Sequence, residues 1–238
     1  MQMVSKDASG PCEDDFKAVV QSVVSSISAG DGFARKVQGV DSRHCQIICR
    51  DQSVGLVGET CLPELKNFKQ RIFIDEEPEM RHDASGRIVL LLESPHRYEF
   101  TSERKGLSPK GPAYGKTGSN IRKFLKNIIP LDFGDIDSHE LILVNAVQFQ
   151  CSLGLPLWNH PDNQKFKNAV VTECLRQKAF RNHLRCRVQS LVKGSTDIIA
   201  IASGQTSGVN QCVEGIVHDL TRQLVAGMGH PSSWGFRR

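Results

Sequence analysis

The sequence predicts an α/β protein with three layers (α/β/α) around a central, mainly parallel, four-stranded sheet. Apolar runs at 88–92, 141–147 and 198–202 are continuous rather than alternating, which is typical of strands buried on both faces. Helical stretches at 119–129 and 168–192 separate these runs, as expected for a parallel sheet. A fourth strand is predicted at 223–226. With 238 residues, the chain is long enough for one domain with a full core.

The N-terminal part of the chain has a different pattern. Apolar residues from Phe16 to Ile27 recur at helical spacing after Glu13, and Gly30 can end the helix. The section 35–83 is interrupted by prolines and is compatible with short strands at 47–49, 54–57 and 71–74. We therefore expect residues 1–86 to form a helical and mixed extension packed on a core domain of residues 87–238.

Composition restricts the compartment and the partners. The net charge of +4 slightly favours a polyanionic partner. The sequence has no apolar run long enough to cross a membrane, and its first residues lack the apolar centre of a signal peptide. We expect a cytoplasmic protein that does not bind membranes.

Polar residues follow the predicted strands. Glu93-Ser94-Pro95-His96 comes directly after the run 88–92, Asn145 lies near the end of the run 141–147, and His230-Pro231-Ser232 follows the last strand. Because open α/β sheets build their sites at the carboxyl ends of their strands, we expect these groups to share one site. A carboxylate can position water as a general base, and an imidazole can donate to a developing negative charge.

The segment 111–119 contains Gly115-Lys116-Thr117-Gly118-Ser119 and invites a nucleotide-binding interpretation. A Walker loop needs four residues between its first glycine and Gly-Lys-Thr, and it follows a buried strand. Here Gly111 and Gly115 enclose three residues, and the preceding segment is polar. The pattern therefore excludes a P-loop NTPase.

Together these segments resemble the uracil-DNA glycosylase superfamily. Leu92-Glu93-Ser94-Pro95 resembles its first motif, His230-Pro231-Ser232 its second, and Gly115-Lys116-Thr117-Gly118 its glycine-rich phosphate contact. The resemblance covers residues 87–238 and implies a uracil-DNA glycosylase-like fold. Ser94 stands where many members have Asp or Asn, so either Glu93 positions the water or catalysis depends mainly on His230.

The resemblance also implies roles for individual residues. The catalytic set is Glu93, Ser94 and His230. Asn145 would read the edge of the base, and Trp234 or Phe236 would be the apolar wedge that replaces a flipped nucleotide. Other residues implied to bind the base are His96, Tyr98 and Tyr114, and those implied to bind DNA are Gly115, Lys116, Thr117, Ser119, Ser232 and Ser233.

The resemblance implies a monofunctional DNA glycosylase, acting as a monomer, that leaves an abasic site in DNA repair or antiviral defence. His96 follows Pro95 where many uracil-specific members have Tyr, which favours a modified, 5-substituted pyrimidine such as a glucosylated hydroxymethylcytosine of phage DNA. The alternative is a non-catalytic nucleic-acid-binding module that retains the fold. Incubation with modified DNA distinguishes the two.

Some branches of this superfamily carry an iron–sulfur cluster on four cysteines. Among the eight cysteines, the candidates are Cys45, Cys49, Cys151 and Cys174. Three residues separate Cys45 from Cys49 instead of the usual two, and both precede the first motif by more than forty positions. We therefore expect no cofactor and no metal, with most cysteines acting as small apolar residues.

Overall fold

The computed structural model describes residues 10–26, 55–58, 71–73, 86–96, 99–103, 106–109, 113, 115–129, 139–149, 151, 161–204 and 208–236. Its elements in chain order are α1 (Glu13–Ser26), β1 (Gly55–Gly58), β2 (Arg71–Phe73), β3 (Gly86–Leu92), β4 (Phe100–Glu103), β5 (Gly106–Pro109), α3 (Lys116–Ile128), β6 (His139–Asn145), α4 (Asn163–Arg176), α5 (Lys178–Leu191), β7 (Ile198–Ile201), α6 (Val209–Val217), β8 (Gln223–Val225) and the 3-10 helix η6 (Pro231–Phe236).

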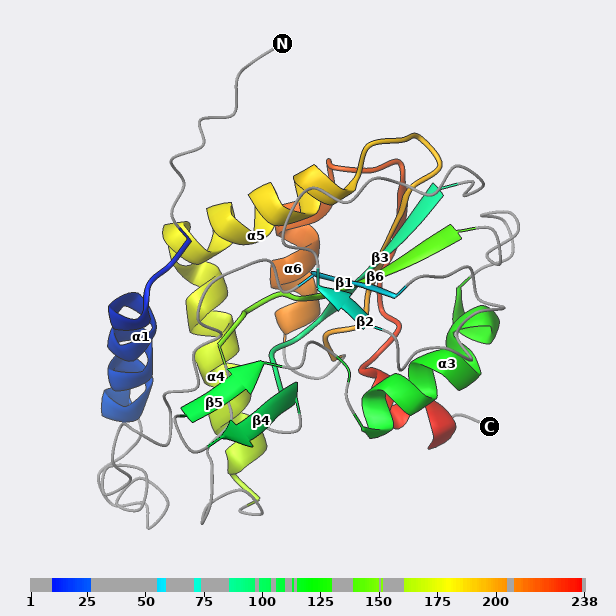
Figure 1. Cartoon of the computed structure of the whole chain (residues 1–238). Helices are drawn as coiled ribbons and strands as arrows, with labels where there is room; N and C mark the ends of the chain where they lie inside the picture. The colour runs from blue at the N-terminus through cyan, green and yellow to red at the C-terminus, as the bar shows by residue number, and fades with distance from the viewer. Residues whose placement is uncertain are drawn as a thin grey trace.

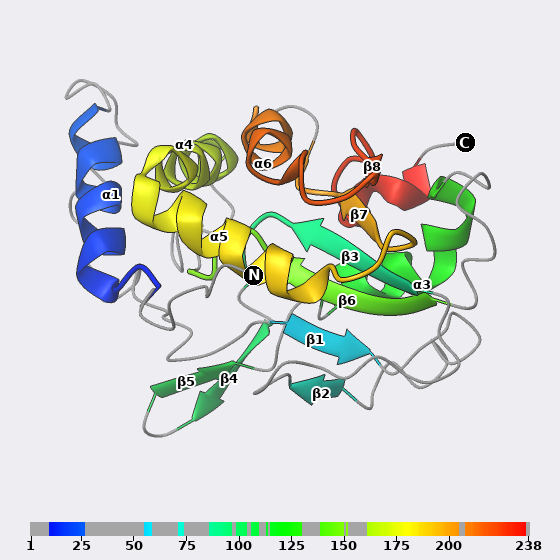
Figure 2. The same ribbon diagram turned by 90° about the horizontal axis from the view of Figure 1, so that it is seen from above.

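The predicted parallel sheet is confirmed. Its strands lie in the order β2-β1-β6-β3-β7-β8, and the four strands β6, β3, β7 and β8 are mutually parallel. The register pairs Leu92 at the end of β3 with Asn145 at the end of β6. Strands β1 and β2 extend the β6 edge in antiparallel fashion, as Figure 2 shows. Two short segments of the N-terminal section therefore belong to the sheet itself.

Helices cover both faces of the sheet, which gives the predicted three layers (Figure 1). Alternate side chains of β3 point to opposite faces. Val89 and Leu91 pack in a core with α4, α5 and α6, while Ile88 and Leu90 pack in a second core with α3 and η6. Helix α1 lies outside α4, where Phe16 stacks on Phe149 with 4.6 Å between ring centroids.

The predicted helix over 168–192 is two helices. Gln177, with ψ of 132°, is extended and separates α4 from α5. The buried positions explain the break: α4 ends its apolar face at Leu175 and α5 begins its own at Phe180. This spacing of five residues does not fit a continuous helical stripe, whose neighbours are three or four apart.

One helix and one pair of strands were also not predicted from the sequence. Helix α6 has nine residues, with Val209, Val213, Ile216 and Val217 buried at helical spacing. Strands β4 and β5 form a separate two-stranded sheet after the first motif. Both elements are short, so their patterns are weak compared with those of the buried strands.

The amino-terminal end of the sheet carries a buried polar cluster. Arg87 at the start of β3 donates to Leu191 O at the end of α5 (3.0 Å) and lies 3.4 Å from a carboxylate oxygen of Glu140. The Arg87 backbone N–H donates to Asp197 before β7 (2.8 Å). These bonds connect three parallel strands and α5 at the end of the sheet opposite the carboxyl edge.

None of the helices in the described ranges is long and apolar enough to cross a membrane.

Candidate active site

The sheet has a topological switch point between β3 and β7. The chain leaves β3 for α3 on one face, whereas it leaves β7 for α6 on the other. Loops that depart to opposite faces from neighbouring strands open a crevice at the carboxyl ends of those strands. Glu93 and Ser94 follow β3 at this point, and Ser203, which bonds Asn210 at 2.5 Å, follows β7. The first predicted motif, Glu93-Ser94, therefore lies where an α/β fold accommodates a ligand.

Glu93 is a buried carboxylate whose cationic partner, Lys167, is half-buried. Its side chain is 4% exposed, and Lys167 Nζ of α4 donates to its Oε2 at 3.1 Å. The Asn168 amide lies 3.2 Å from Oε1 and donates to it once its nitrogen is turned toward the carboxylate. Burial raises the pKa of Glu93, and the Lys167 ammonium opposes that rise. The ion pair with Lys167 therefore favours the ionised form of Glu93 against the larger effect of burial.

Two thiols lie beside this carboxylate. Cys151 is buried and donates to Phe149 O (3.3 Å), and its pKa is raised well above its usual range by burial, with Cys174 and Glu93 adding to the rise. A hydrogen bond with Ser94 acts in the opposite direction. Ser94 is half-buried and contacts a thiol that stays protonated, so this contact does not activate its hydroxyl. The carboxylate of Glu93 is therefore the better candidate to position water.

His230 has a defined tautomer. Its Nδ1 accepts from the Ser232 backbone N–H (3.2 Å) and lies 2.8 Å from the Ser232 hydroxyl. A backbone N–H only donates, so Nδ1 carries no proton in the neutral ring and Nε2 carries it. Burial lowers the pKa of His230 to about 4, and Lys167 and His96 lower it further. At neutral pH the side chain is a neutral imidazole whose Nε2–H can donate.

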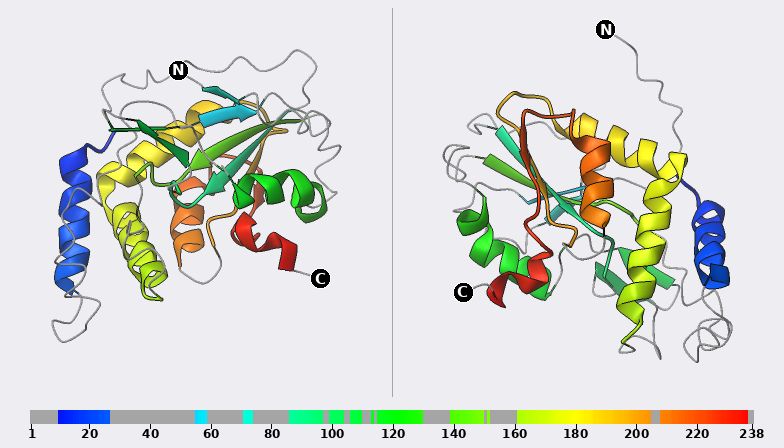
Figure 3. Two further views of the ribbon diagram at one scale, coloured as in Figure 1. Left: turned by 60° about the horizontal axis from the view of Figure 1, so that its bottom comes forward. Right: turned by 180° about the vertical axis from the view of Figure 1, so that it is seen from behind.

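The loop that carries His230 is fixed against α3. Asn120 Nδ2 donates to Pro231 O (2.8 Å), and both views in Figure 3 show η6 lying along α3. This contact brings two groups of predicted DNA-binding residues to the same end of the molecule. Of these, Gly115, Lys116, Ser119 and Ser233 are exposed, and Thr117 and Ser232 are half-exposed. Helix α3 has no acidic residue in its first turn, so nothing there opposes a phosphate.

Asn145 lies at the end of β6 and is fully buried. Its Nδ2 donates to Glu99 Oε2 at 3.1 Å, and the other carboxylate oxygen of Glu99 accepts from the Ala113 backbone N–H at 3.0 Å. Arg187 of α5 donates to the Asn145 backbone carbonyl (3.1 Å). Ala113 has a left-handed φ of 59° directly before α3. Glu99 therefore links the end of β6 to the loop that leads into α3.

The wedge predicted at Trp234 is wrong for the conformation described. The indole is 2% exposed, belongs to the core beneath α3, and donates from Nε1 to Met228 O and Gly229 O, each at 3.0 Å. A wedge must project from the surface. Trp234 instead stabilises the loop before His230, because its indole N–H donates to the carbonyls of Met228 and Gly229 in that loop.

This role makes Trp234→Phe informative. Phenylalanine keeps most of the ring but cannot donate, so two buried carbonyls lose their partner. We expect the variant to be less stable by about 1–3 kcal/mol in urea unfolding. Activity on single-stranded and duplex substrates should fall by the same factor, whereas a wedge would make the loss larger on the duplex.

Several predicted residues are not covered. Tyr98 and Tyr114, expected to bind the base, and Cys45 and Cys49 of the proposed cluster lie outside the described residues. His96 is half-buried and close enough to His230 to affect its pKa. Cys151 and Cys174 are free thiols, and the described ranges contain no group of three or more potential metal ligands.

Two residues of the site were missed in the sequence. Lys167 stands in a polar stretch of α4, and only the packing of that helix brings it to Glu93. Glu99 follows the first motif closely, but a single glutamate near a hairpin carries no pattern.

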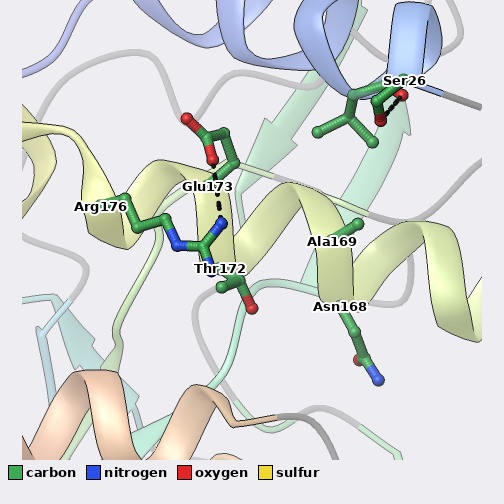
Figure 4. A pocket seen from close by; sticks show the side chains of 7 residues that line it. Ser26, Asn168, Ala169, Thr172, Glu173 and Arg176 are labelled. Carbon is green, nitrogen blue, oxygen red and sulfur yellow. Dashed lines mark hydrogen bonds and ion pairs between the residues drawn. The ribbon is translucent and has the colours of Figure 1, made fainter.

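A hollow between α1 and α4 (Figure 4) is lined by Val23, Ser26, Asn168, Ala169, Thr172, Glu173 and Arg176. It contains none of the predicted site residues.

The lowered histidine pKa values predict acid sensitivity. Burial lowers the pKa of both His183 and His230 to about 4, against 6.5 in the unfolded chain. The unfolded state therefore takes up protons first, so their stabilising contribution is complete above pH 6.5 and is lost as the pH falls toward 4. We expect the urea midpoint to drop between pH 7 and 5, and to drop less in His183→Gln. The exposed His218→Gln variant serves as the control.

Comparison with known proteins gives no relative: no family model, no curated protein and no solved structure matches the chain.

Proposed function

We propose that this chain is a DNA glycosylase that hydrolyses the N-glycosidic bond of a flipped pyrimidine and leaves an abasic site. The observation that supports the proposal best is the neutral His230 ring, whose Nδ1 accepts from Ser232 and whose Nε2–H remains to donate. Lys167, which donates to the buried Glu93 carboxylate, is close enough to His230 to lower its pKa. The resemblance of the two motifs to the uracil-DNA glycosylase superfamily supports the same reaction.

The chemistry follows from charge. When the bond between C1′ and the ring nitrogen breaks, both electrons leave with the base, which becomes anionic, while the sugar becomes cationic. A neutral imidazole N–H directed at a carbonyl of the base stabilises the anion more than the neutral ground state. Lys167 adds positive charge on the same side of the site. Both groups therefore act mainly in the transition state.

Glu93 has the complementary role. Its carboxylate stabilises the cationic sugar and directs a water molecule to C1′; the water oxygen bonds to C1′ and one of its protons passes to the carboxylate. The Lys167 ion pair matters because it opposes the rise in pKa that burial imposes on Glu93. A protonated glutamate could neither accept that proton nor stabilise the sugar.

DNA would approach along the edge formed by α3 and η6. The amide groups at the start of α3, with Lys116, Thr117 and Ser119, and the hydroxyls of Ser232 and Ser233 suit phosphate oxygens. We further propose that the base is a modified pyrimidine of phage DNA, because His96 replaces the tyrosine that would close the pocket against 5-substituents.

The proposal is tested by strand cleavage after base loss. Oligonucleotides carrying uracil, cytosine, 5-hydroxymethylcytosine or its glucosylated form are incubated with the protein and treated with alkali, which breaks the strand at abasic sites. Breaks at the modified base support a glycosylase, and the absence of breaks before alkali supports a monofunctional one. Binding without breaks on every substrate would instead identify a non-catalytic nucleic-acid-binding module.

A further inference from the structure

The Glu99 carboxylate is fixed on both sides. It is 5% exposed, its Oε1 accepts from the Ala113 backbone N–H (3.0 Å), and its Oε2 accepts from Asn145 Nδ2 (3.1 Å). The Ala113 donor cannot turn, because it belongs to the backbone of a buried residue with φ of 59°. Both carboxylate oxygens of Glu99 are therefore acceptors, one toward Ala113 and one toward Asn145. The Asn145 side chain must then direct its Nδ2 toward Glu99.

The other end of that amide is unsatisfied. Asn145 is fully buried, and its Oδ1 has no hydrogen-bond partner in the described part of the chain. Buried carbonyl oxygens are almost always paired, so one left open at the carboxyl edge of a parallel sheet indicates a place for a donor from a ligand. The cross-strand partner of Asn145 is Leu92, which directly precedes Glu93.

We propose that Glu99 is a positioning residue that sets the hydrogen-bonding polarity of the site, so that the pocket takes a base with an exocyclic amine, a 4-aminopyrimidine, in preference to a 4-oxopyrimidine. The Asn145 oxygen accepts from the amine, and the nearby buried carboxylate disfavours a carbonyl in the same place. This inference rests on the proposed function, because it names the class of base that the same site would excise.

The proposal predicts an inversion in Glu99→Gln. Glutamine has the shape of glutamate, but only one of its two terminal atoms is an acceptor oxygen. That oxygen accepts from the fixed Ala113 N–H. The glutamine NH₂ then faces Asn145, whose amide turns over and presents its own NH₂ to the ligand in place of its oxygen. A 4-carbonyl becomes the matching group and a 4-amine the mismatched one.

The experiment measures binding rather than turnover. Two oligonucleotides differ only in the 4-amino or 4-oxo group of one pyrimidine, whose sugar carries a 2′-fluorine so that the glycosidic bond survives. For the wild type we expect tighter binding of the 4-amino form by about tenfold. In Glu99→Gln the ratio should reverse. Glu173→Gln on α4 makes the same change away from Asn145 and should leave the ratio as in the wild type.

The outcomes separate the two proposals. Selective binding that Glu99→Gln leaves unchanged overturns the role of Glu99, and a wild type that prefers the 4-oxo form overturns the assigned class of base. Binding of neither pyrimidine above an unmodified strand contradicts the proposed function itself. If Glu99→Gln does not fold, Asn145→Leu decides: it removes the amide, so the two oligonucleotides should bind equally, and a retained 4-amino preference would refute the inference.

Discussion

Replacing His230 with alanine is expected to lower the single-turnover rate of base excision by about a hundredfold or more, with little change in DNA affinity. The Nε2–H of His230 would donate to charge that develops only as the bond breaks, so its loss costs little in the bound ground state. Rapid-quench measurement of abasic sites gives the rate, and filter binding to a 2′-fluorinated substrate gives the affinity.

Two further variants sharpen this prediction. His230→Gln can still present an N–H and should recover part of the lost rate, although it cannot accept from Ser232 with the same geometry. His218→Ala removes an exposed imidazole at the end of α6 and should behave as the wild type. A loss of rate matched by an equal loss of affinity would show that His230 binds DNA and does not stabilise the departing base.

The buried strands were the most predictable part of the fold. The centres of β3, β6 and β7 are continuous apolar runs (88–92, 141–144 and 198–201), because helices cover both faces of the sheet there. The split between α4 and α5 was missed at Gln177, a residue that neither caps nor breaks helices by its chemistry. Only the five-residue spacing between the buried Leu175 and Phe180 marks the break. This spacing can be interpreted only when it is known which residues of each helix are buried.

The candidate site was predictable where it follows strand ends and unpredictable where it depends on helix packing. Glu93 and Asn145 follow parallel neighbours, so their proximity follows from sheet topology alone. Lys167 reaches Glu93 only because α4 packs on the core that contains Val89 and Leu91 of β3, and no local pattern marks it. Trp234 was misassigned for a related reason: an aromatic near the C-terminus fits a wedge and a core residue equally well until its neighbours are known.

Replacing Lys167 with methionine should slow excision at neutral pH by at least about tenfold and shift the acid limb of the pH–rate profile to higher pH. Methionine keeps the apolar stem but removes the charge that opposes the effect of burial on the pKa of Glu93, so that pKa rises further. The pKa of His230 should rise too, because Lys167 helps to lower it. Raising the pH should recover part of the rate by ionising Glu93 again.

The chain offers a matched control on the same helix. Lys165 is 85% exposed and pairs with Asp162 at 3.1 Å, so Lys165→Met removes the same charge two residues away without touching Glu93. Its pH–rate profile should coincide with that of the wild type.

The pH dependence of stability gives an independent check. With a folded pKa above its unfolded value, Glu93 contributes stability that is lost as the pH rises through the folded pKa. Lys167→Met should therefore lose stability with rising pH, and adding Glu93→Gln should abolish that dependence. If the Lys167→Met profile keeps the wild-type midpoint at a reduced height, Lys167 does not control the ionisation of Glu93, and its part in the site is limited to packing.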